Sequence, residues 1–373
     1  MNDIGVRALN RALIPAIPTW YKRGGDGYEL AYALNASYVK KLLDEPVAGI
    51  ASLVHTGRGR FLTWEEKMQY LGEIVDICHD ADKFHIIGVE TIQDARLAKD
   101  LGFDMVLVFP GIHSPPNSQD PSDMDSLVQH HQEIARIHGF TCAFCLYAET
   151  AVGIQYDPPD LIRLLSIDGV NAVKFALLSD FEKLEDAMVA IGKHAPNTIM
   201  FTGEDRMFAE SLEKTKDLSS CNILPDPPRI NALTGLGSVL PALQVFMLKT
   251  FDKPEYSGEY MKVRALVAAL ARATFKRPLN DGHADYTLPM EGYISNVATG
   301  SAFQFNIPSN AISDIATIEK ERIARGIPRI IGKALENHQA EQDVEEIIKL
   351  VETGLDMDRA LKDKYGSQLD RIE

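Results

Sequence analysis

The segment VNAVKFALLSDFEKLEDAMVAIGKH, residues 170–194, decides the fold. Its first seven residues are nearly all apolar, which is typical of a strand buried on both faces. From Asp180 onward, apolar residues recur at helical spacing. A buried strand followed at once by an amphipathic helix predicts one repeating unit of a parallel α/β sheet.

The same alternation of strand and helix recurs along the chain. A second amphipathic segment, 63–80, opens with Thr63 and Glu66 in the spacing of a capping box. Strands are predicted at 13–19, 47–53, 84–90, 104–110, 141–147, 170–176, 197–203 and 229–236. Eight such units over roughly 240 residues favour an α/β fold of the (β/α)8 TIM-barrel type. A doubly wound open sheet is the alternative, but no G-x-G-x-x-G follows the first strand.

The pattern changes after residue 255. Helices are predicted at 259–276, 313–326 and 342–354, and a loop at 277–289. We therefore expect a barrel over residues 1–255 and a helical extension over 256–373 that packs on it.

Composition narrows the classes of function. The 373 residues are 45% hydrophobic and carry a net charge of −15, which argues against nucleic acid or an anionic membrane as the main partner. The sequence contains no apolar run of about 18 residues, and its start lacks a signal-peptide pattern, so a cytoplasmic protein is expected. Cys142 and Cys145 would point to opposite faces of a strand, which favours buried, reduced thiols over a redox pair.

Lys174 is the unusual residue of the first segment. Strand alternation places it between Ala172 and Ala176 on the face that would line the barrel, opposite the bulky apolar residues. One interpretation is a structural lysine paired with a carboxylate. The other is an amine whose pKa burial lowers, so that it attacks a ketone or aldehyde and forms a Schiff base. That chemistry needs neither a metal nor an organic cofactor.

Two neighbouring strand ends carry groups that suit such a site. Tyr147 ends the strand before Lys174 and could relay a proton, although it could equally be a rim residue. After the second strand, His55, Thr56 and Gly57 form a turn whose N–H groups and hydroxyl could hold a carboxylate or phosphate. Turn chemistry alone explains the glycine equally well.

The order and spacing of several segments resemble the dihydrodipicolinate synthase/N-acetylneuraminate lyase family of class I aldolase-type barrels. These segments, within residues 12–295, are 14–67, FCLY (144–147), AVKFALLSDFEKL (172–184), FTGED (201–205), NALTGLGSVLPAL (231–243) and PMEGYI (289–294).

The resemblance implies a role for each matching residue. Lys174 would form the imine with a 2-keto acid. Tyr147 would relay protons and contact the substrate carboxylate. Thr56 and the turn at Gly57 would bind that carboxylate, and His55 stands where the family usually has Ser or Thr in the relay. Gly203 and Leu233 would line the keto-acid pocket.

Departures from the family pattern bear on the substrate. Arg58 replaces the family's glutamate, Val152 or its neighbours stand where the synthases hold a second carboxylate with arginine, and Ile112 replaces an aromatic of the relay. A true dihydrodipicolinate synthase is therefore not expected, and N-acetylneuraminate lyase is not supported. Glu149 and His113 would give the mouth of the barrel, at the carboxyl ends of the strands, a different polar lining. That lining would suit a different aldehyde or sugar acid.

We therefore expect a Schiff-base lyase that acts on a 2-keto acid by aldol cleavage, condensation or dehydration, as a homo-oligomer (dimer or tetramer). Two alternatives stay open. One is a metal-dependent barrel enzyme that uses His55, His85, Glu90 and His113, although no metal-ligand spacing is present. The other is a barrel that binds a small molecule without turnover.

Overall fold

Seven parallel strands form one curled sheet in sequence order. The computed structural model describes residues 9–19, 21–24, 27–57, 59, 62–110, 124–146, 156–177, 180–274 and 340–372. The strands are β3 (Gly49–Ser52), β4 (Phe84–Val89), β5 (Met105–Val108), β6 (Thr141–Leu146), β7 (Val170–Ala176), β8 (Ile199–Thr202) and β9 (Asn231–Ala232). Each coincides with a predicted strand, and β7 matches residue for residue.

Residues 12–17 close the sheet into a barrel by bonding to both of its edges. On one side, the N–H of Ile14 donates to the carbonyl of Ala232 at 2.8 Å. On the other side, the N–H of Ala51 donates to Pro15 at 2.8 Å, and the N–H of Ile17 donates to Ala51 at 3.0 Å. This segment takes the place of the eighth strand through two isolated parallel bridges, so the (β/α)8 barrel predicted from the sequence is confirmed.

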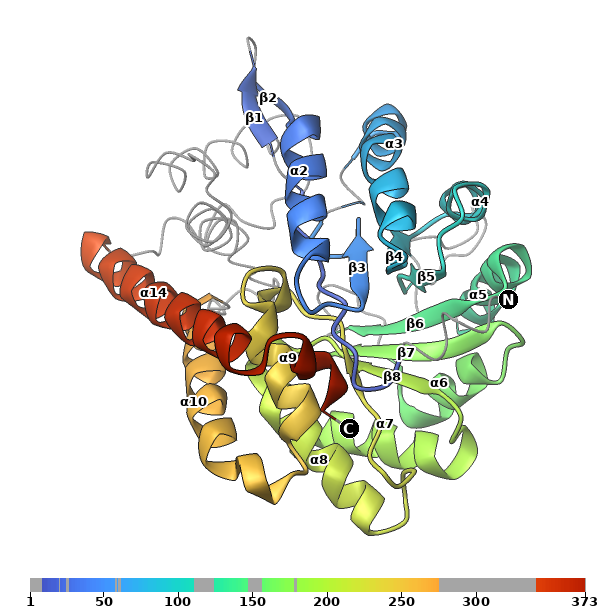
Figure 1. Cartoon of the computed structure of the whole chain (residues 1–373). Coiled ribbons are helices and arrows are strands. Elements are labelled where there is room, and N and C mark those ends of the chain that lie inside the picture. Colours follow the sequence, from blue (N-terminus) through green and yellow to red (C-terminus); the bar gives the residue numbers. More distant parts are fainter. Residues whose placement is uncertain are drawn as a thin grey trace.

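Helices surround the sheet, as Figure 1 shows. They are α2 (Tyr32–Leu43), α3 (Trp64–Asp80), α4 (Ile92–Asp100), α5 (Met124–His138), α6 (Pro158–Leu165), α7 (Phe181–His194), α8 (Phe208–Ser220) and α9 (Pro241–Thr250). The buried faces of strands and helices form one large apolar core, with a small separate cluster of Ala135, Ala143 and Val170. An antiparallel hairpin of β1 (Tyr21–Gly24) and β2 (Gly27–Leu30), which the sequence reasoning did not predict, precedes α2.

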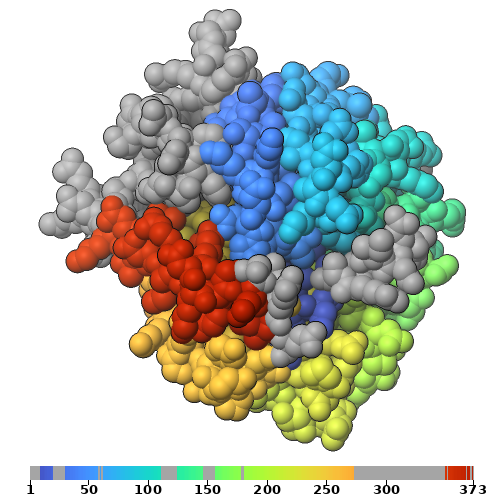
Figure 2. All heavy atoms as spheres, viewed as in Figure 1, coloured from blue at the N-terminus to red at the C-terminus, as the bar shows by residue number. Residues whose placement is uncertain are grey.

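The carboxyl-terminal helix α14 (Ala340–Tyr365) packs against α9 and α10 (Ser257–Thr274). Figure 2 shows it lying across the surface beside α10. The buried carboxylate of Asp358 accepts a hydrogen bond from the N–H of Leu243 at 3.2 Å. Lys362 forms ion pairs with Asp358, one turn earlier in the same helix, at 2.9 Å and with Glu45, just after α2, at 2.5 Å. Asp358 therefore ties α14 to the beginning of α9, and Lys362 ties it to the end of α2.

Two predicted helices of this region, 259–276 and 342–354, correspond to α10 and to part of α14. The predicted helix 313–326 and loop 277–289 lie outside the described residues. The division of the chain at residue 255 stays a prediction. Within the described part of the chain, no helix has the length and apolar character needed to cross a membrane.

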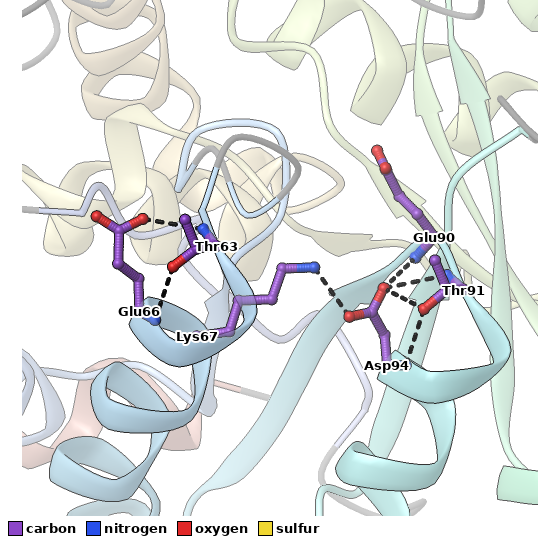
Figure 3. A network of polar contacts seen from close by, with 6 residues as sticks. All are labelled: Thr63, Glu66, Lys67, Glu90, Thr91 and Asp94. Atoms are coloured by element: carbon purple, nitrogen blue, oxygen red, sulfur yellow. Dashed lines mark hydrogen bonds and ion pairs between the residues drawn. The ribbon is translucent and has the colours of Figure 1, made fainter. Parts of the chain in front are cut away.

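A buried carboxylate joins the beginnings of α3 and α4 (Figure 3). Asp94 accepts hydrogen bonds from the N–H of Glu90 at 3.2 Å and from the N–H and hydroxyl of Thr91 at 3.0 and 2.9 Å. Its second oxygen accepts one from Lys67 of α3 at 2.8 Å. The capping box of α4 is thus also the link that fixes the loop after β4 to the neighbouring helix.

We predict that Asp94→Ala lowers the free energy of unfolding by about 3 kcal/mol, because it leaves a largely buried lysine and two backbone N–H groups without their acceptor. The matched control is Glu66→Ala, which removes the third-position carboxylate of the α3 capping box near the surface. That change should cost about 1 kcal/mol or less. Urea denaturation measures both, and equal losses would contradict the prediction.

Candidate active site

The Lys174 side chain is buried, with 4% exposure, on the barrel-lining side of β7. Lys174 lies beside Phe144 of β6 and Phe201 of β8 in the strand register. Its Nζ is 4.5 Å from the centroid of the Phe144 ring. The charge of Lys174 also acts on the thiol of Cys142 and on the carboxylate of Asp205. The amine of Lys174 thus lies among groups from β6 and from the loop after β8.

Gly203, which directly follows β8, makes room for the lysine stem. A Cβ added at this position would lie 2.1 Å from Cε of Lys174 and 2.8 Å from the carbonyl oxygen of Phe175. The N–H of Gly203 donates to that same carbonyl at 2.7 Å, which fixes the glycine backbone. Any larger residue here would displace either the lysine or strand β7.

A buried carboxylate that sequence reasoning missed holds the loop after β9. Asp205 accepts hydrogen bonds from the N–H groups of Gly235 at 2.9 Å and Leu236 at 3.1 Å, and from the amide of Gln244 at 3.0 Å. Burial raises the pKa of Asp205 to about 6, although these bonds and the charge of Lys174 lower it. The only sequence signal was an acidic residue just after a predicted strand.

The turn after β3 begins with a strained residue and ends at a tightly packed glycine. Leu53 has φ of 51°, and a Cβ at Gly57 would lie 2.9 Å from the Leu53 nitrogen. Thr19 donates a hydrogen bond to the Gly57 carbonyl at 2.6 Å. His55 and Thr56, between these points, are buried. Because β3 and β7 are four strands apart in an eight-stranded barrel, this turn lies on the wall opposite Lys174.

Of the other predicted site residues, the structure describes Leu233. Leu233 is fully buried, and its N–H donates to Thr202 at 2.8 Å, so it continues the sheet at the beginning of the loop that Asp205 holds. Tyr147, Glu149 and His113 lie outside the described residues. Their proposed roles, like those of His55, Thr56 and Gly57, stay predictions.

The alternative of a metal site formed by His55, His85, Glu90 and His113 fails for two of these residues, because His85 and Glu90 cannot share a site. His85 is at the beginning of β4 and Glu90 follows its end, so the two lie at opposite ends of the barrel wall. His85 Nε2 is 2.9 Å from the hydroxyl of Ser52, and burial lowers its pKa to about 3. It is a core histidine. Among the residues that the structure describes, no group of three His, Cys, Asp or Glu could hold a metal ion.

The cysteines of the C-x-x-C motif are buried and unbonded to each other. Burial raises the pKa of both Cys142 and Cys145, so both remain protonated thiols. The prediction of buried, reduced cysteines is confirmed.

We predict that Gly203→Ala displaces the Lys174 stem and lowers the free energy of unfolding by about 1–3 kcal/mol, because the new Cβ overlaps Cε. The control is Gly72→Ala in α3, where an added Cβ meets nothing within 4 Å. That change should stabilise the protein by about 0.5–1 kcal/mol, since glycine is a poor helix former. Urea denaturation compares the two, and a neutral or stabilising Gly203→Ala would contradict the geometry.

Asp205 should leave a signature in the pH dependence of stability. Its folded pKa is raised above the unfolded value, so the folded state binds the proton more tightly, and this group's contribution to stability falls as pH rises from about 4 to about 6. We predict that this decline, on the order of 3 kcal/mol, is absent in Asp205→Asn. Parallel pH curves of unfolding free energy for the wild type and the variant would refute the assignment.

Comparisons with known proteins agree with this barrel. The chain is 29% identical over 164 residues to 4-hydroxy-tetrahydrodipicolinate synthase of Methanococcus aeolicus, covering 42% of this chain and 51% of that one. The chain thus matches about half the length of this curated relative.

Two solved structures share the fold. Sialic acid aldolase of Ruminococcus gnavus superposes with a TM-score of 0.66 at 13% identity, covering 96% of this chain and 99% of that one. It has also been solved as a catalytic lysine mutant, so that aldolase has a catalytic lysine. Dihydrodipicolinate synthase of Thermotoga maritima gives a TM-score of 0.58 at 17% identity, covering 94% and 99%.

At such identities the solved structures establish the fold alone, and membership rests on sequence. The profile of the Dihydrodipicolinate synthetase family matches residues 10–217, which is more than half of the chain and includes both the turn after β3 and Lys174. The chain therefore belongs to the Dihydrodipicolinate synthetase family.

Proposed function

We propose that this protein is a Schiff-base lyase that acts on a 2-keto acid through Lys174. The observation that carries the proposal is the amine itself, buried on the lining face of β7 against a glycine at which any added Cβ would overlap the lysine stem. The family assignment supports it, as does the catalytic lysine of the structurally similar aldolase.

The chemistry follows from a nucleophilic amine. The neutral amine attacks the keto carbon, a C–N bond forms, and water leaves as the carbinolamine takes up a proton and becomes an iminium ion. The iminium withdraws electrons from the adjacent carbon, so a C–H or C–C bond there can break and leave an enamine. The enamine then forms a C–C bond to an aldehyde, or expels a hydroxyl from the next carbon as water, and hydrolysis of the iminium frees Lys174. None of these steps requires an oxidant or a reductant.

The remaining groups of the mouth have proposed tasks. Thr56 and the N–H groups of the turn at Gly57 hold the substrate carboxylate from the wall opposite β7. Tyr147 and His55 relay protons, and Leu233 lines the pocket beside Gly203.

Glu149 and His113 are proposed to select the second substrate, an aldehyde or sugar acid with hydroxyl groups. Their side chains can donate and accept hydrogen bonds, which hydroxyl groups require. A homo-oligomeric state and a cytoplasmic location are further parts of the proposal.

The test is reduction by borohydride in the presence of pyruvate, which converts an imine into a stable secondary amine. We predict a covalent adduct on the peptide that contains Lys174. Lys174→Arg should abolish the adduct, because arginine keeps the charge but offers no nucleophilic amine at neutral pH. Lys193→Arg, at an exposed position of α7, is the matched control and should leave the adduct unchanged.

A panel of 2-keto acids extends the test beyond pyruvate. If every member leaves the wild type unlabelled, or if label appears equally in Lys174→Arg, the proposed function is wrong. Adduct formation without exchange of the pyruvate methyl protons would instead identify a barrel that binds the keto acid without turnover.

A further inference from the structure

The ring of Phe144 lies under the reactive nitrogen. It is fully buried, and Nζ of Lys174 lies over its face at 4.5 Å from the centroid. Phe109 packs its ring against Phe144 nearly at right angles, with centroids 5.2 Å apart and an interplanar angle of 73°. Phe109 is itself confined, because a Cβ at Gly88 would lie 2.9 Å from its ring. The ring under the amine is therefore held in one orientation.

A one-residue irregularity creates this contact. The register of β6 and β7 pairs Thr141 with Val170 but Cys142 with Ala172, so Asn171 is an extra residue in β7. Without that shift, Phe144 would pair with Val173, whose side chain points to the opposite face from Lys174. Bulges of this kind re-aim side chains next to active sites.

We propose that the face of Phe144 stabilises the positive charge on the imine nitrogen of Lys174, and so drives imine formation from the neutral amine. This rests on the proposed function. An aromatic face attracts a cation through its quadrupole, and the attraction is largest where water is excluded. The ring contacts the reacting atom directly, so its contribution is electrostatic as well as steric.

Charge balance makes the effect depend on pH. Neutral amine, keto acid and one proton give iminium and water, so a cation appears next to the ring. When the amine is protonated, ammonium and keto acid give iminium and water. The reactants and the products then each carry one cation next to the ring. The ring therefore favours the imine only above the midpoint at which Lys174 loses its proton, and it also raises that midpoint.

Other groups near Lys174 cannot account for an effect of the ring at position 144 on imine formation. Asp205, after β8, titrates with a pKa of about 6 and stabilises either cation once ionised. Cys142, on β6, stays a neutral thiol because burial raises its pKa. His55 lies on the opposite wall of the barrel. None of these groups changes when only the ring at position 144 is altered, so their contributions cancel in a comparison of ring variants.

The experiment replaces Phe144 in the full chain with phenylalanines that carry one, two and three fluorines, which weaken the quadrupole while nearly preserving size. The fraction of protein trapped by borohydride is measured against pyruvate concentration across a range of pH. The same substitutions at Phe246, buried in α9 against Tyr256 and Tyr365, are the control.

Above the midpoint, the apparent dissociation constant of pyruvate should rise stepwise with fluorine number, by about tenfold across the series. Below the pH midpoint at which Lys174 loses its proton, the dissociation constant should stay the same in all variants. That pH midpoint itself should fall by up to about one pH unit across the series. The inference would be overturned if the dissociation constant did not depend on fluorine number, if it changed equally at all pH values, or if substitutions at Phe246 had the same effect. Each of these results would leave the lysine chemistry intact. A wild type that traps no pyruvate would refute the proposed function itself, and this inference with it.

Discussion

The constraint on which the site depends is the enclosure of one amine inside a closed barrel. Lys174 reaches this interior because strand alternation turns it inward and because Gly203 leaves space for its stem. Burial disfavours a charged nitrogen, whereas the face of Phe144 and the field of Asp205 favour it. The balance between these effects determines when the nitrogen carries a proton, which is the property that Schiff-base chemistry requires an enzyme to control.

Barrel closure is the precondition for that enclosure. The segment 12–17 bonds to the strands on both sides of it, so the lining residues meet around a common interior and not at an open sheet edge. Closure also brings the turn after β3 to the wall facing β7. Asp205 fixes the loop after β9, Asp94 fixes the loop after β4, and α14 is tied to the beginning of α9. The mouth is thus held at several points by buried carboxylates.

Periodicity in the sequence was sufficient to predict the strands, the barrel and the inward position of Lys174, because these depend on local alternation. The hairpin β1–β2 was missed because it lies between the first strand and its helix, where the repeating pattern has no place for it. Asp205 and Phe144 were missed for a different reason. Their importance depends on pairing between strands, and the shift at Asn171 that aligns Phe144 with Lys174 cannot be read from either strand alone.

The most direct test of the account is a crystal structure of the protein soaked with pyruvate and related 2-keto acids. We predict electron density continuous from Nζ of Lys174 to the keto carbon, with the ligand enclosed between β7 and the turn at Thr56. A nitrogen engaged by a carboxylate, with every keto acid excluded from the barrel or bound elsewhere without a covalent link, would contradict it.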